Sequence, residues 1–249
     1  MIEEMTPELA EICGIHAGDG YLRGPFKRAE LDISGNVEEQ EYYDNHVVPL
    51  FEKAFNLKIN ARLFPSRNTY GFVIRDRTVI AKMHSLGFPY GAKSLVVSTP
   101  KEILDSENKE VKYRFLRGLF DTDGCVNFFR RNYGKYGIFK KTRDYYPRIG
   151  MGIVSESLSK NVYTLLSELD FVCSTSTYQP KNPNYSKKYC VFLNGVINLE
   201  KWVQNIGFKN SCKFSRYLVW KEHGFCPANL SFEQRKQILN KQIDPNSFY

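Results

Sequence analysis

The sequence predicts an α+β fold made by tandem duplication of one αββαββα unit, with the two copies related by a pseudo-twofold axis. Two pairs of similar segments support this prediction. ICGIHAGDG at residues 12–20 is repeated as LRGLFDTDG at 116–124, and LGF at 86–88 followed by Lys93 is repeated as IGF at 206–208 followed by Lys213. The first pair is offset by 104 residues and the second by 120, so the second copy is longer by 16 residues. A chain of 249 residues, 42% hydrophobic and 25% charged, suits two small globular units.

The first copy begins with a helix that Thr6 can cap, with Pro7 at its first position and Gly20 at its end. Strand-like runs and polar turns then predict an antiparallel four-stranded sheet with two further helices. In order, these elements are strands Tyr21–Gly24 and Ala29–Ser34, helix Glu38–Phe55, strands Lys58–Pro65 and Tyr70–Arg75, and helix Thr78–Leu86.

The second copy repeats this order. Its elements are helix Glu110–Thr122, strands Cys125–Arg131 and Arg148–Ser155, helix Ser157–Leu169, strands Cys173–Gln179 and Tyr189–Asn194, and helix Ile197–Asn205. Between the copies, residues 94–109 mix Pro, Ser and charge, which is typical of a linker. We therefore expect an N-terminal half at 1–93, a linker at 94–109, a C-terminal half at 110–213 and a helical tail at 214–249.

The composition is basic, with 35 Lys and Arg against 27 Asp and Glu, a net charge of +8 and a pI near 9.1. Such an excess of cations suggests a polyanionic partner. No run of about 18 apolar residues is present and the N-terminal segment is acidic, so we expect neither a membrane span nor a secretory signal. The expected location is intracellular, in the cytoplasm or nucleoid or in an organelle matrix. The six cysteines form no CxxC pair, which predicts free thiols and no structural zinc.

The charges are divided among the predicted elements. The helix at 38–55 is acidic, whereas the strand pairs and the segment 125–148, an expected long hairpin with many aromatic residues, are basic. This pattern predicts basic strands that follow nucleic-acid phosphates, with acidic helices facing solvent. The residues that we expect to contact DNA are Arg23, Lys27, Arg28, Arg62, Arg67, Arg75, Arg77, Arg130, Arg131, Lys140, Lys141, Arg148, Lys187 and Lys188.

Small residues lie on both repeated helices: Gly14, Ala17 and Gly18 in the first copy, and Gly118 and Thr122 in the second. They would let the two helices pack closely, which brings Asp19 and Asp123 together at the helix ends. Two carboxylates held close together repel each other, and binding of a divalent cation between them would neutralise their charge. Paired acids that hold metal ions serve phosphodiester hydrolysis.

The segments ICGIHAGDG and LRGLFDTDG resemble the two motifs of the single-chain LAGLIDADG homing endonucleases, and the resemblance extends from about Leu9 to Trp220. It implies motif helices at the interface between the halves and two sheets that form a saddle over DNA. It also implies that Asp19 and Asp123 are the cleavage acids, and that Lys93 and Lys213, after the last helix of each half, lie near the scissile phosphates.

The resemblance implies Mg²⁺ as cofactor, with Mn²⁺ as a substitute and Ca²⁺ supporting binding without cleavage. We assign Gly18 and Thr122 to the metal site beside the two aspartates. The first motif departs from the family pattern at Ala17 and His16. Asp121 is expected to be structural, and His16 is expected to be a core or interface residue and not a ligand.

The leading hypothesis is a site-specific double-strand DNA endonuclease that acts as a monomer on a long asymmetric site. The resemblance implies four-base 3′ overhangs. Two alternatives remain open: an intron-encoded maturase that binds its own intron RNA, and a nucleic-acid-binding regulator without cleavage activity. No membrane partner is expected. We do not expect a protein-splicing element, which would begin with Cys or Ser and end in His-Asn.

Overall fold

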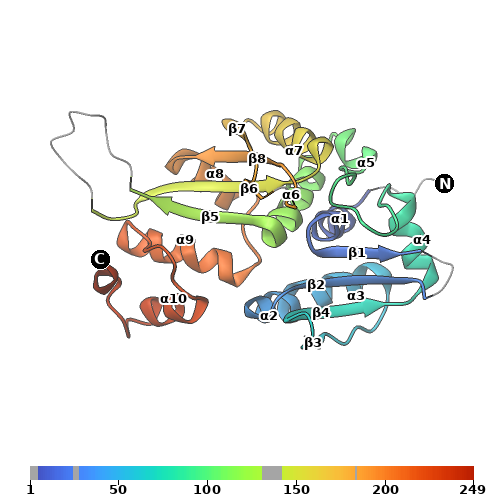
Figure 1. The fold of residues 1–249 in the computed structure, drawn as a ribbon, viewed down its shortest axis with the longest axis horizontal. Helices are drawn as coiled ribbons and strands as arrows, with labels where there is room; N and C mark the ends of the chain where they lie inside the picture. Colours follow the sequence, from blue (N-terminus) through green and yellow to red (C-terminus); the bar gives the residue numbers. More distant parts are fainter. Residues whose placement is uncertain (1–4, 25–27, 131–141, 183) are drawn as a thin grey trace.

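Two four-stranded antiparallel sheets, one in each half of the chain, form the frame of the molecule (Figure 1). The computed structural model describes residues 5–24, 28–130, 142–182 and 184–249. Both sheets have the same strand order, β1-β2-β4-β3 and β5-β6-β8-β7, which confirms the predicted duplication of an α+β unit. Among the described residues, no helix is both long enough and apolar enough to span a bilayer.

The first half follows the predicted order with two changes of detail. Its elements are α1 (Pro7–Asp19), β1 (Gly20–Arg23), β2 (Glu30–Asn36), a helical segment made of η1 (Val37–Glu39), α2 (Gln40–Tyr42), η2 (Tyr43–Val47) and α3 (Val48–Phe55), then β3 (Arg62–Phe64), β4 (Thr69–Ile74) and α4 (Arg77–Ser85). The prediction of one regular helix at 38–55 was wrong. Tyr43–Val47 is a π-turn, in which the Val48 amide bonds to Tyr43 O, and Pro49 follows without an amide to continue a regular ladder. Strand β3 begins at Arg62 and not at Lys58.

The second half repeats the pattern. Its elements are α6 (Lys109–Asp123), β5 (Gly124–Phe129), β6 (Tyr146–Ile153), α7 (Glu156–Glu168), β7 (Cys173–Tyr178), β8 (Lys188–Asn194) and α8 (Val196–Asn205). All lie within a few residues of their predicted positions. The expected hairpin extension falls at 131–141, outside the described residues.

Helices α1 and α6 lie side by side between the two sheets (Figure 1). Glycine permits their close approach, since a Cβ on Gly14 would stand 2.2 Å from Phe115 O, and one on Gly118 would stand 2.3 Å from Glu11 O. Any side chain at either position would push the helices apart. The small residues of the two motifs therefore set the distance between the halves, as the sequence predicts.

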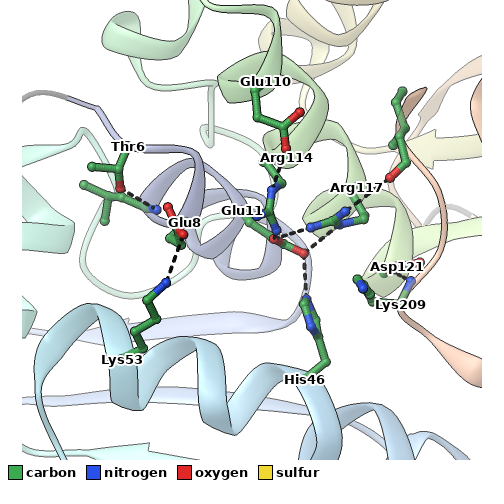
Figure 2. Close-up of polar contacts among 12 residues, drawn as sticks. Thr6, Glu8, Glu11, His46, Lys53, Glu110, Arg114, Arg117, Asp121 and Lys209 are labelled. Atoms are coloured by element: carbon green, nitrogen blue, oxygen red, sulfur yellow. Dashed lines mark hydrogen bonds and ion pairs between the residues drawn. The ribbon is translucent and has the colours of Figure 1, made fainter. Parts of the chain in front are cut away.

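A buried carboxylate also joins these helices (Figure 2). Glu11 of α1 is fully buried and accepts hydrogen bonds from Arg114 Nη1 at 2.6 Å, from Arg117 Nε at 2.8 Å and Nη2 at 2.7 Å, and lies 2.7 Å from His46 Nε2. Burial alone would raise the pKa of Glu11, but the hydrogen bonds from His46 and Arg117 outweigh it and lower the pKa to about 2. The duplication does not repeat this cluster, because Phe115 stands where the second copy would place the acid.

The linker and the tail contact both halves. The linker includes α5 (Lys101–Leu104), and its Val97 O accepts a hydrogen bond from Ser155 Oγ at 2.6 Å. The tail begins three residues before its predicted start at 214, and consists of α9 (Ser211–His223), α10 (Phe232–Leu239) and η3 (Pro245–Phe248). It reaches the first half through Cys212 Sγ, which donates to Glu38 O, and through the ion pair of Lys236 with Glu41. The tail therefore fixes the two halves in position as well as extending the second one.

We predict that Glu11→Gln destabilises the protein by about 3–5 kcal/mol, because Arg117 would keep its largely buried charge without a counter-charge and Arg114 would keep only Glu110. Glu8→Gln is the matched control on the same helix. Its ion pair with Lys53 is exposed (Lys53 side chain 76% accessible), so its loss should cost less than about 1 kcal/mol. Urea unfolding measures both values.

The same cluster predicts a dependence on pH. The folded-state pKa of Glu11 is below the ordinary value of 4.5, so its contribution to stability is present above about pH 4.5 and is lost as the pH falls toward about 2. Glu11→Gln should therefore differ most from the parent above pH 4.5 and approach it in acid. A constant difference across this range would show that the carboxylate charge is not what stabilises the interface.

Candidate active site

The two motif helices end at the same place in the molecule, next to the first strand of each sheet. Asp19 is the last residue of α1 and Asp123 the last of α6, and each is followed directly by the glycine that begins β1 or β5. The Asp123 carboxyl carbon lies 3.4 Å from the point where a Cβ on Gly18 would stand. The Asp123 side chain is exposed, whereas Asp19 is half-buried. The structure thus brings the two predicted acids to one site.

Asp19 is in an unfavourable environment for a charged carboxylate. Burial, followed by the negative charges of Asp123 and Glu39, raises the pKa of Asp19 to about 7. The hydrogen bond that Tyr43 Oη donates to Asp19 Oδ2, at 2.8 Å, acts in the opposite direction. A positive charge placed among these carboxylates would therefore be stabilised strongly.

The two predicted lysines occupy equivalent positions at the ends of the motif helices. Lys93 Nζ donates to Ala17 O at 2.9 Å and to Gly18 O at 2.6 Å. Lys213 Nζ donates to Phe120 O at 2.8 Å and to Thr122 O at 2.7 Å. Each ammonium thus binds the last carbonyls of one motif helix, where the helix dipole is negative. Burial lowers the pKa of Lys93.

Three polar residues at this site were not predicted from the sequence. Besides Tyr43, they are Glu39 of η1 and Asn210, whose Nδ2 donates to Glu39 Oε1 and to Asp121 O, both at 2.7 Å. The expectation that acids of this helix face solvent is wrong for Glu39, which faces Asp19. Its spacing of four residues from Tyr43 places both on one helix face. Only the packing of that helix beside α1 shows that this face points to the site.

Two motif residues lie away from the reactive groups. His16 is buried edge-on against Phe88 with ring centroids 4.5 Å apart, and burial, followed by the charge of Lys93, lowers its pKa to about 3. Asp121 is buried and accepts a hydrogen bond from the Lys209 amide at 2.8 Å (Figure 2). Both therefore act within the core, as expected.

The donors at the site suit a hard divalent cation. Besides the two aspartates, the carbonyls of Gly18 and Thr122 stand at the helix ends, so every candidate ligand is oxygen. Each of these carbonyl oxygens already accepts a hydrogen bond from Lys93 or Lys213, so a cation would have to share or replace that contact. Within the described ranges, no three His, Cys, Asp or Glu side chains form a complete metal cage. A magnesium ion would fit such an incomplete set, because it commonly keeps several waters and takes further ligands from substrate phosphate.

The exposed face of the first sheet carries several of the predicted DNA contacts. In β1 and β2, Leu22, Leu31 and Ile33 point into the core, so the alternate residues face outward. Arg23 pairs with Glu30 at 3.1 Å, and Arg67 pairs with Asp32 at 2.7 Å. The cations on or beside this face are Arg23, Arg62, Arg67 and Arg75, against the acids Glu30 and Asp32.

The exposed face of the second sheet is less basic than predicted. The register places Cys125, Asn127, Phe129, Tyr146, Phe192, Asn194, Ser174, Ser176 and Tyr178 on this face, with Arg148 and Lys188 as the only cations of its strands. The Arg148 guanidinium lies over the Phe129 and Phe192 rings at 4.9 and 4.8 Å and donates to Asn194 Oδ1. Of the basic residues counted in the segment 125–148, Arg130 and Arg143 are not in a strand, and Arg131, Lys135, Lys140 and Lys141 lie outside the described residues.

The other predicted contacts have varied positions. Arg130 pairs with Asp144, Lys187 lies over the Tyr189 ring, Arg28 is in the loop before β2, and Arg77 begins α4 and so is not on a strand. Lys27, Arg131, Lys140 and Lys141 lie outside the described residues.

Parts of the chain are similar to known proteins in sequence, and its fold is similar to solved structures. Residues 110–207, which contain the second motif and the second sheet, match the family model described as a LAGLIDADG-like domain. The first half has the same strand order and the equivalent motif helix. The second half of the chain therefore carries a LAGLIDADG-like domain. The fold of the whole chain is similar to that of the homing endonuclease I-DmoI, in a mesophilic variant, with a TM-score of 0.53, 15% identity, and coverage of 82% of this chain and 97% of that one.

Two further similarities concern the whole chain. I-DmoI in complex with DNA and Mn gives a TM-score of 0.52 at 15% identity, over 81% of this chain and 96% of that one, and other I-DmoI complexes with DNA contain Ca or Mg. A glutamine–fructose-6-phosphate aminotransferase of Methanocaldococcus jannaschii is 25% identical over 85% of this chain but over only 17% of its own length. The curated relatives that it matches are much longer, and the chain spans between 10% and 26% of their lengths.

The unfavourable environment of the Asp19 carboxylate predicts that removing its charge stabilises the metal-free protein. The folded-state pKa of Asp19 is raised above its ordinary value of 3.8, so its ionisation costs stability progressively as the pH rises from about 4 to about 7. Asp19→Asn should therefore stabilise the metal-free protein above pH 7 by at least about 1 kcal/mol, or about 2–4 °C in Tm. Thermal unfolding in EDTA measures the change.

Calcium provides the control for this prediction. If the carboxylates hold a divalent cation, Ca²⁺ should raise the Tm of the parent protein and reduce or reverse the difference from Asp19→Asn. A variant that is less stable than the parent in EDTA at pH 8 would contradict the prediction.

Proposed function

We propose that this protein is a LAGLIDADG endonuclease that cuts both strands of a long asymmetric DNA site by metal-dependent phosphodiester hydrolysis, leaving 3′ overhangs. The observation that carries the proposal is the meeting of Asp19 and Asp123 at the ends of the paired motif helices, between two exposed sheet faces. The fold is that of I-DmoI, which has been solved with DNA and Mn. The chain would act as a monomer, because it contains both motif helices.

The paired acids favour cleavage over the alternatives of RNA binding for splicing and DNA binding without cleavage. Neither alternative needs two carboxylates at one point. Holding them there costs stability, because burial, followed by the charges of Asp123 and Glu39, raises the pKa of Asp19. Groups whose charge is destabilised by their surroundings occur most often at functional sites.

Each group at the site has a proposed role. The Asp19 and Asp123 carboxylates, with the Gly18 and Thr122 carbonyls, would hold Mg²⁺ or Mn²⁺. When bound, such a cation would supply an activated water and stabilise charge on the leaving 3′ oxygen. Lys93 and Lys213 hold fixed positive charge at the helix ends, where it can offset the charge that develops on the phosphate. The outward-facing cations would bind backbone phosphates on either side.

The decisive experiment uses the single variants Asp19→Asn and Asp123→Asn on a target duplex recovered by selection from a randomised library. Each should lose double-strand cleavage in Mg²⁺ while it retains binding in Ca²⁺, and either can leave a nick in one strand. Denaturing gels with each strand labelled separately measure the cuts. Full cleavage by both variants would remove the two-carboxylate mechanism, and binding without cleavage by the parent would favour a regulator.

The lysines are tested by Lys93→Met and Lys213→Met. If each acts on the scissile phosphate, the cleavage rate of the bound complex should fall by about 10²-fold or more, with affinity in Ca²⁺ little changed. Simple anchoring of phosphate predicts weaker binding with a near-normal single-turnover rate at saturation. Because both ammonium groups also bind helix carbonyls, the Tm of each variant must be measured, and a loss of stability alone would leave the saturated rate unchanged.

The first sheet is tested by replacing Arg62, Arg67 and Arg75 together with alanine. Without these cations DNA binding should weaken, and the slope of log K against log [salt] should fall by about 0.9 for each phosphate that is no longer neutralised. Lys160→Ala is the control, since Lys160 lies on α7, on the helical side of the second sheet. An unchanged slope in the triple variant would show that this sheet face does not bind the DNA backbone.

A further inference from the structure

The surroundings of the two aspartates are not symmetric, although the duplication makes the aspartates themselves equivalent. Tyr43 is buried, and its Oη donates a hydrogen bond to Asp19 Oδ2 at 2.8 Å. In the described part of the chain, no group donates a hydrogen bond to the Asp123 carboxylate, and that side chain is exposed. Asp19 is therefore held by a neighbour from its own half, whereas Asp123 is not.

The difference can be traced to particular substitutions between the copies. Asn36 and Ser155 cap the helical segments that follow the second strand of each sheet, so they are equivalent, 119 residues apart. The same offset makes Val162 the equivalent of Tyr43, and Leu158 the equivalent of Glu39. The second copy thus has apolar side chains where the first has a hydroxyl and a carboxylate.

The strand that ends beside Asp19 provides room for this arrangement. A Cβ on Gly35 would stand 2.7 Å from Asp19 Oδ2, 2.8 Å from Glu39 Oε2 and 2.9 Å from Tyr43 Oη. The three oxygens therefore converge above a position that only glycine leaves open. Gly20 pairs with Ile33 and Gly124 with Met151, so the strand residue equivalent to Gly35 in the second copy is Ile153, which has a side chain.

The Tyr43 ring is itself fixed by its neighbours. It packs edge-on against Tyr42 and Tyr70, with ring centroids 5.8 and 6.2 Å away. Tyr70 is held in turn, because its Oη donates to Asp44 Oδ1 at 2.7 Å. A donor on a fixed ring holds the carboxylate that it binds in one rotamer.

We propose that Tyr43 is a positioning residue for Asp19, and that it makes strand cleavage unequal, with the strand served by Asp19 cut first. The proposal rests on the endonuclease function proposed above. The Asp19 carboxylate is already oriented in the free protein, with Oδ1 left for other ligands. Asp123 must be ordered from an exposed side chain when substrate and cation bind, which slows assembly of its half of the site.

The test is Tyr43→Phe, which removes the hydroxyl and keeps the ring. Single-turnover cleavage in Mg²⁺, with each strand labelled separately, should show that the parent cuts one strand faster. Tyr43→Phe should slow that cut by about 10-fold, the scale for losing one hydrogen bond to a charged group, and leave the other within about twofold. Asp19→Asn identifies the strand, since it must lose the same cut.

Tyr42→Phe is the matched control. Tyr42 is adjacent and buried, and its hydroxyl has no hydrogen-bond partner among the described residues, so its removal should leave the ratio of the two rates unchanged. Equal slowing of both strands by Tyr43→Phe, or no slowing, would overturn the positioning role. Absence of cleavage by the parent protein would instead refute the endonuclease function.

A second measurement does not depend on activity. In protein labelled with ¹³C at the aspartate carboxyl groups, Asp19→Asn assigns the Asp19 resonance. Tyr43→Phe should shift that resonance in the metal-free protein, and Tyr42→Phe should not. An Asp19 resonance unchanged by Tyr43→Phe would show that the hydrogen bond is absent in solution and would also overturn the proposal.

Discussion

The close packing of α1 against α6 is the constraint on which the rest of the structure depends. Backbone touches backbone at Gly14 and Gly118, so the relative position of the two halves is set by atoms that cannot adjust. This packing places Asp19 and Asp123 at one point and the two lysines at equivalent helix ends. The helix packing also sets the position of the two sheets relative to each other, because β1 and β5 continue directly from the helices.

One buried ion cluster, built around a carboxylate of the first copy, also stabilises the contact between α1 and α6. Glu11 binds Arg114 and Arg117 across the interface, and His46 closes the cluster from the first half. A buried ion cluster seldom adds much net stability, but it penalises any arrangement that leaves one partner unpaired. Here the cluster favours packing of a first half against a second half. Two second halves could not form it, since they have Phe115 where the first half has Glu11. The duplication supplied a symmetric interface, and a few charged substitutions made it specific.

Much of this architecture could be predicted from the sequence, for physical reasons. The motif helices, their caps and the order of the strands depend on local patterns such as Thr6 before Pro7 and alternation along β1 and β2, which act over a few residues. The equivalence of Lys93 and Lys213 was predicted by aligning the two copies. The π-turn at Tyr43–Val47 was not predicted, because the composition of that segment suits a regular helix. Nor was the small number of cations on the strands of the second sheet, since a count of basic residues over a segment does not show which of them lie on a strand.

Glu39, Tyr43 and Asn210 show why a site is harder to predict than a fold. They come from a helical segment of the first half and from the residue that caps the tail helix, 171 residues apart in the case of Glu39 and Asn210. No local pattern joins them, and the second copy has Leu158 and Val162 in place of Glu39 and Tyr43, so comparison of the copies pointed away from them. They converge only because α9 packs against the first half as well as the second. Symmetry within the sequence therefore identified the groups that both halves share, whereas the groups that make the two halves of the site unequal depend on tertiary packing.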